Sequence, residues 1–132
     1  MKPNPVVFTV KGMLPLSLNQ MLRTHPMKRY RLSQEFGMLI KAAATKEDIR
    51  CLRAWRDLDY KLSVKVEITN PREFDEDNLS GFGKWGLDQM VMMQWLRNDS
   101  PDCVRFEKPS QSKGPKSITF RIAPIRENNE KV

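Results

Sequence analysis

A stretch of strict alternation in the middle of the chain constrains the fold more than any other feature. Over residues 60–70, apolar side chains alternate with polar ones, the apolar set being Leu62, Val64, Val66 and Ile68. A period of two is typical of a β-strand that buries one face and exposes the other. The buried face needs a partner layer, so the chain must supply helices or further strands to cover it.

The remaining segments predict the elements around this strand. Apolar and polar side chains alternate over residues 6–11 and predict a strand. Residues 12–30 hold two prolines and show no periodic pattern of apolar residues, which predicts a long connection. Ser33 is expected to cap a helix that runs to about residue 45, and residues 47–55 continue it or form a further turn. A second helix is expected over residues 84–96, with strands over 104–108 and 117–122 joined by a loop at 109–116.

The order of these elements, β-α-β-α-β-β, predicts an α+β fold. We expect a small mixed or antiparallel sheet of about four strands with two helices on one face. The chain has 132 residues, which suffices for one domain. Residues 1–125 are expected to form that domain and residues 126–132 a polar C-terminal tail.

The net charge of +7 is unevenly distributed along the chain. Residues 1–58 carry 11 basic and 4 acidic side chains, whereas residues 59–132 carry 12 of each. A basic half favours a polyanion partner, most simply nucleic acid, although many small proteins are basic for solubility alone.

Several protein classes are not expected. No apolar run approaches the roughly 20 residues of a membrane span, and the N-terminus has no apolar export region. Cys51 and Cys103 are isolated from each other in sequence and match no metal or redox spacing. These features predict a cytoplasmic protein that makes no membrane contact.

A run of carboxylates interrupts this basic chain. Residues 73–77 read Glu-Phe-Asp-Glu-Asp, and an extended backbone would place Asp75 and Asp77 on one face. Two neighbouring carboxylates supply only oxygen ligands, which suit Mg²⁺ or Mn²⁺. The spacing does not fit a calcium loop, and the single histidine, His25, argues against zinc. The alternative is structural, because acidic residues also gather before helices and cap them.

Other residues are candidates for the same site. Asp99 is the best candidate for a third carboxylate, with Asp102 as its competitor and Asp88 as an outer group or a surface residue. Phe74 is expected to anchor the acidic run in the core rather than to stack on DNA.

Basic side chains are the candidates for binding DNA phosphates. They are Lys28, Arg29, Arg31, Arg72, Lys113 and Lys116. Arg50, Arg53 and Arg56 recur every three residues and are expected to share a helix face.

Together these motifs resemble the RusA-type Holliday-junction resolvases, which are crossover-junction endodeoxyribonucleases. The resemblance spans about residues 6–124 and is carried by Asp75-Glu76-Asp77-Asn78-Leu79 after a strand, Lys84-x-x-Leu87-Asp88, Asn98-Asp99 and the upstream Pro15-x-Ser17-x-Asn19. The Asp-x-Asp-Asn-Leu core is its most specific part.

The resemblance implies a homodimeric, Mg²⁺-dependent hydrolase that cuts paired strands at four-way DNA junctions during recombination and repair. The metal-binding aspartates of the family correspond to Asp75, Asp77 and Asp99, and the catalytic lysine to Lys84. Family members place that lysine four residues after the second aspartate, where this chain has Gly81. About three inserted residues precede Lys84, so either a looped insertion returns Lys84 to the site or another base replaces it. A phage or bacterial source is expected.

Two further interpretations stay open from the residues alone. A non-catalytic basic DNA-binding or regulatory protein would use the acidic run only as a helix cap. An Asp-x-Asp enzyme acting on nucleotide-sugars would leave the basic half of this small chain unexplained.

Overall fold

The computed structural model describes residues 4–14, 18–75, 79 and 81–125. Its strands are β1 (Val6–Lys11), β2 (Leu62–Asn70), β3 (Val104–Phe106), β4 (Ser110–Lys113) and β5 (Ser117–Pro124). Its helices are α1 (Leu18–Arg23), α2 (Pro26–Ala43), α3 (Lys46–Asp57) and α5 (Phe82–Met92). The predicted α+β class is confirmed, and the sheet has one strand more than the expected four.

The five strands form one mixed sheet built around β2. The strand order is β1-β5-β2-β3, with antiparallel pairing between β1 and β5 and between β5 and β2. On its other side β2 has two parallel neighbours. β3 pairs with residues 62–64 of β2, and β4 pairs with residues 67–70. Pro109 lies between these two short strands, which together line one edge of β2.

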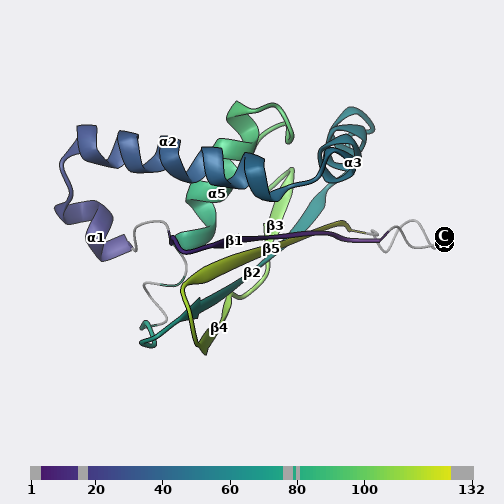
Figure 1. Ribbon diagram of the computed structural model, residues 1–132. Coiled ribbons are helices and arrows are strands. Elements are labelled where there is room, and N and C mark those ends of the chain that lie inside the picture. Colours follow the sequence, from purple (N-terminus) through teal and green to yellow (C-terminus); the bar gives the residue numbers. More distant parts are fainter. Residues whose placement is uncertain (1–3, 15–17, 76–78, 80, 126–132) are drawn as a thin grey trace.

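The helices cover one face of this sheet (Figure 1). The alternating residues of β2 point into that layer, and every second residue from Leu62 to Asn70 is buried. The facing side chains come from the helices, with Phe36, Ile40, Leu52 and Leu87 fully buried. On the opposite face β1 and β5 are joined by the hydroxyls of Thr9 and Thr119, 2.8 Å apart. The predicted half-buried strand is therefore confirmed.

The expected connection over residues 12–30 is wrong, because it contains α1 and the first turn of α2. Pro26 occupies the beginning of α2, where the missing proline N–H has no helical partner to lose. His25 caps the helix, since its Nδ1 accepts a hydrogen bond from Met27 N at 3.1 Å. The predicted cap Ser33 instead lies inside α2.

Helix α3 begins at a capping box of its own residues and contacts the end of α5 through two arginines. Thr45 and Asp48 form a reciprocal capping box at its beginning. Arg53 donates to Met93 O at 3.4 Å, and Arg56 donates to Gln94 O. These carbonyls follow α5, where unpaired helix C-terminal acceptors favour cationic donors. The predicted arginine face therefore belongs partly to the packing of α3 against the end of α5.

Further boundaries differ from the prediction, since β3 ends two residues earlier than expected and β5 two residues later. The expected loop at 109–116 contains β4, and the expected helix at 84–96 begins two residues earlier and ends at Met92. Within the residues described above, no helix is both long enough and apolar enough to cross a membrane.

Candidate active site

Helix α5 lies close to the sheet because small residues face the strands. A Cβ on Gly86 would overlap the Phe120 ring of β5, and one on Gly83 would lie 2.9 Å from Val66 Cγ2 of β2. Phe82, Leu87 and Met90 are buried on the same helix. Lys84 and Asp88 are one helical turn apart and exposed.

A carboxyl pair forms where α5 meets the turn that follows it. The carboxyl of Asp88 lies close enough to that of Asp99 for Asp99 to raise the pKa of Asp88, although the two residues are eleven positions apart. Although Asp88 is exposed as a residue, partial desolvation of its carboxyl raises its pKa, and interaction with the Asp99 carboxyl raises it further. The positive charge of Lys84 acts in the opposite direction on the same pKa. Lys84, Asp88 and Asp99 are thus electrostatically connected.

The turn that carries Asp99 is fixed by local hydrogen bonds. Asn98 Oδ1 accepts from Ser100 N at 2.8 Å, and Ser100 O accepts from the backbone N–H groups of Cys103 and Val104, both at 2.9 Å. Asp99 is half-buried in this turn, whereas the competing Asp102 is exposed. The structure therefore favours Asp99 over Asp102 as a member of the site.

The acidic run begins beyond the end of β2. Asp75 is exposed, and its carbonyl accepts a hydrogen bond from Leu79 N at 3.2 Å. Phe74 is half-buried and makes an edge contact with Phe82, with ring centroids 4.9 Å apart. The expected role of Phe74 as a core anchor is confirmed. Asp77 and the motif residues Pro15 and Ser17 lie outside the described residues.

Within the part of the chain that the structure describes, no acidic side chain caps α5. The N-cap residue of α5 is Gly81, which makes no side-chain capping hydrogen bond. The first turn of α5 contains no acidic residue. The carboxylate of Asp75, six residues before Gly81, is therefore not part of that cap.

The ligand set present suits a hard divalent ion only in part. Asp88 and Asp99 supply carboxylate oxygens from two elements, which is the donor type that Mg²⁺ and Mn²⁺ prefer. Within the described ranges, no group of three His, Cys, Asp or Glu side chains is placed to hold a metal. Asp75 thus does not complete a triad with this pair, while the position of Asp77 is not described.

The candidate DNA-binding residues form two groups. Lys28, Arg29 and Arg31 belong to the first turns of α2 rather than to a loop. Lys28 and Arg31 are exposed there, and Arg29 is half-buried with a buried Nε that has no partner among the described residues.

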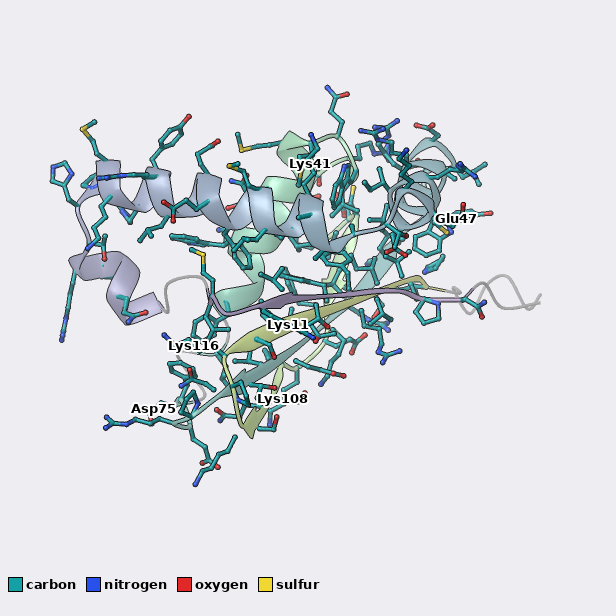
Figure 2. All side chains as sticks on the ribbon, in the orientation of Figure 1. Lys11, Lys41, Glu47, Asp75, Lys108 and Lys116 are labelled. Atoms are coloured by element: carbon teal, nitrogen blue, oxygen red, sulfur yellow. The ribbon has the colours of Figure 1, made fainter. Side chains whose placement is uncertain are left out.

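The second group surrounds the end of β2. Lys113 pairs with Asn70 in the β4–β2 register, and Lys116 precedes β5, where its carbonyl accepts from Gly12 N at 2.8 Å. Arg72 is exposed just beyond β2. Figure 2 shows Lys116 at the same end of the sheet as Asp75. Basic side chains thus flank the acidic run.

The sequence predicted one residue of the site only in part and missed a contact beside the acidic run. Asp88 was expected to be an outer or surface group, yet its four-residue spacing from Lys84 on one helix could have indicated the pair. Gln111 bonds to the backbone of Phe74, and no sequence pattern indicates that contact.

Comparison with known proteins does not place the chain in a family. Neither a scan against protein-family models nor a search of curated proteins finds a match. The resemblance to the RusA-type resolvases therefore stays a prediction that rests on the motifs quoted above.

Proposed function

We propose that this chain is a metal-dependent, structure-selective endodeoxyribonuclease that resolves four-way DNA junctions, as the RusA-type resolvases do. The observation that carries the proposal is the Asp88–Asp99 carboxyl pair beside Lys84. Neighbouring carboxylates repel each other when both are ionised, and a shared divalent cation removes that repulsion.

Phosphodiester hydrolysis accounts for this combination of charges. When bound by these carboxylates, Mg²⁺ or Mn²⁺ would supply an activated water and would stabilise the charge on the leaving oxygen. The resemblance assigns the cation to Asp75, Asp77 and Asp99, and of these the described structure brings only Asp99 to Asp88. Asp88 would orient Asp99. A neutral Asp88 donates a hydrogen bond to Asp99, whereas an ionised one adds negative charge for the cation.

Lys84 has a separate task in this scheme. Its ammonium group would neutralise the negative charge that develops on the scissile phosphate. Lys84 is exposed on α5 and close enough to Asp88 to affect its pKa. This position supports the interpretation in which the inserted residues before Lys84 return it to the site.

Branched DNA is proposed as the substrate because the basic residues are spread over separate elements. Lysine and arginine side chains lie on the first turns of α2 and around the end of β2. In the sequence these two groups stand on either side of the acidic run. Such contacts bind phosphates without reading base sequence. A homodimer is part of the proposal, because two copies of one site on a two-fold axis match paired symmetric cuts.

The test is a cleavage assay with a synthetic four-way junction and a linear duplex of the same sequence, each with and without Mg²⁺. We expect paired, symmetric nicks only on the junction and only with the metal. If the protein bound the junction without cleaving it under any divalent ion, the chain would instead be the non-catalytic DNA-binding protein.

A further inference from the structure

The beginning of α2 presents an aromatic ring to solvent. Tyr30 is 67% exposed, and Met27, one helical turn before it, is 74% exposed. The buried residues of α2 lie in its second half, where Phe36 and Ile40 belong to the core. In Figure 1 the beginning of α2 extends beyond the sheet. The ring of Tyr30 therefore does not serve to cover the core.

The charge around this ring has one sign. Lys28 and Arg31 are exposed on the same turns as Tyr30, and the half-buried Arg29 precedes it. None of these three cations forms an ion pair with a described residue. Glu35 is the first acidic residue of the chain, so no carboxylate precedes it to balance them. A surface of this kind attracts a polyanion and repels a second copy of itself.

An aromatic ring among cations fits an unpaired nucleic-acid strand. The bases of a single strand expose their faces and stack on aromatic side chains, while Lys and Arg contact the phosphates between them. In a duplex those faces are covered by neighbouring base pairs, so such a surface reaches only the phosphates.

A lipid surface matches these residues less well. A helix that binds membranes needs a broad apolar face. Over the first half of α2, which the structure describes in full, only Met27 and Tyr30 are exposed large apolar side chains. The density of cations beside a single ring therefore favours nucleic acid over lipid.

We propose that the beginning of α2 binds an unpaired nucleic-acid strand, with a base stacked on Tyr30 and neighbouring phosphates on Lys28 and Arg31. The inference goes beyond the proposed nuclease, because it needs neither a bound metal nor cleavage. The cations account for binding of any nucleic acid, and the ring accounts for a preference for unpaired bases.

The test measures the binding of labelled strands by fluorescence anisotropy in EDTA, without divalent metal. The probes are oligo(dT), a strand of the same length made of abasic sites, and a duplex. Oligo(dT) and the abasic strand carry the same phosphates, so they differ in the bases available for stacking. An oligo(U) probe distinguishes RNA from DNA as the source of the strand.

The variants separate the ring from its apolar bulk. Tyr30→Leu removes the aromatic face and keeps an apolar side chain, whereas Tyr30→Phe keeps the ring. The matched control is Tyr60→Leu, because Tyr60 is the other tyrosine of the chain and is also exposed, beyond the end of α3. The double variant Lys28→Gln/Arg31→Gln removes the two exposed cations.

We expect Tyr30→Leu to bind oligo(dT) about tenfold more weakly, as for the loss of one stacked base. Tyr30→Phe and Tyr60→Leu should bind it normally, and all three should bind the abasic strand and the duplex as the unsubstituted protein does. The double variant should bind every probe more weakly. Its slope of log affinity against log salt for oligo(dT) should decrease by about 1.4.

The outcomes separate this inference from the proposed function. Equal affinity of the unsubstituted protein for oligo(dT) and the abasic strand would overturn the inference, as would normal oligo(dT) binding by Tyr30→Leu. Binding to phosphatidylserine vesicles that Tyr30→Leu retains, together with no preference for oligo(dT), would assign the surface to lipid headgroups instead. A chain that stacks bases on Tyr30 but never cleaves a junction would lose the proposed function and keep this inference.

Discussion

Gln89 of α5 donates a hydrogen bond from Nε2 to Ser33 Oγ of α2 at 2.8 Å. The Gln89 side chain is buried against Gly37, where any Cβ would overlap its Oε1. This polar contact within the helix layer fixes the position of α5 along its axis, and its rotation about that axis, relative to α2. The same helix carries Lys84 and Asp88, so the contact also places two residues of the candidate site.

Removal of the Ser33 hydroxyl should destabilise the fold. In Ser33→Ala the buried amide of Gln89 loses its oxygen acceptor and keeps only the weak acceptor Met92 Sδ at 3.7 Å, which costs about 1–3 kcal/mol of the free energy of unfolding. Urea denaturation followed by circular dichroism measures this change. Ser110→Ala, on an exposed edge strand, is the control and should change the free energy by less than about 0.5 kcal/mol. Equal effects of the two substitutions would contradict the role of the Gln89 contact.

Loss of the Asp99 carboxylate should separate cleavage from binding. We expect Asp99→Asn to lower the rate of junction cleavage by at least about 100-fold. The loss of a direct metal ligand should lower the rate more than the loss of a residue that only orients a ligand. Junction affinity in a gel-shift assay without metal should be unchanged or slightly higher. Asp102→Asn is the matched control, since Asp102 lies in the same turn and is exposed. Normal cleavage by Asp99→Asn would exclude the proposed site.

The charge on Lys84 should matter for the chemical step. Lys84→Met retains most of the side-chain volume and removes the ammonium group, and we expect the saturated cleavage rate to fall by about 100- to 1,000-fold. Lys84→Arg keeps the charge and should retain part of the rate. Single-turnover cleavage of a labelled junction measures both. A full rate in Lys84→Met would mean that another group serves in place of Lys84.

Salt dependence should report the phosphate contacts near the end of β2. In the double variant Lys113→Gln/Lys116→Gln, two phosphate contacts are lost, so the slope of log affinity against log salt should decrease by about 2. The control is Lys41→Gln/Lys46→Gln, which has the same net charge but changes the end of α2 and the beginning of α3. Identical slopes in the two double variants would place the DNA elsewhere.

The raised pKa of Asp88 predicts a pH-dependent stability. A carboxyl that binds its proton more tightly in the folded state stabilises the fold at low pH. This contribution is complete at pH values below the pKa of aspartate in the unfolded chain, about 3.9. It is lost as the pH rises through the higher pKa that Asp88 has in the folded state. Asp88→Asn removes it.

The measurement is the free energy of unfolding of both proteins across this pH range. The free energy of unfolding of Asp88→Asn, relative to that of the unsubstituted protein, should increase as the pH rises and then become constant. We call this difference the advantage of the variant. Added Mg²⁺ should reduce that advantage above the transition, because the cation stabilises the ionised pair. A difference that does not vary with pH would show that Asp88 titrates normally.

The sequence predicts those parts of the fold whose burial follows a simple period. β2 is half-buried along its whole length, so its alternation gives its buried face and its end at Asn70, although the strand begins at Leu62, two residues later than expected. The beginning of α2 escapes such reasoning because Pro26 interrupts a pattern in general but is tolerated at a helix N-terminus. β4 escapes it because its four residues are polar and exposed or half-buried, so no apolar side chain marks the strand.

The candidate site divides in the same way. Asp75 and Asp77 stand out because carboxylates are dense there, and Asp99 because it occupies a turn before a strand. The contacts between Asp88 and Asp99 and between Gln111 and Phe74 join separate elements. Only the packing of α5 and the path of the edge strand bring these partners together, and neither is encoded in a local pattern.

The division of the sheet edge at Pro109 has a consequence for how the protein behaves at high concentration. Long exposed strands invite other chains to add to the sheet and so promote aggregation. Here the edge is split into strands of three and four residues, and proline stands between them. Three of the four side chains of β4 are also exposed. Such an edge offers another polypeptide little to pair with, so this basic protein can leave it open to solvent without assembling into fibres.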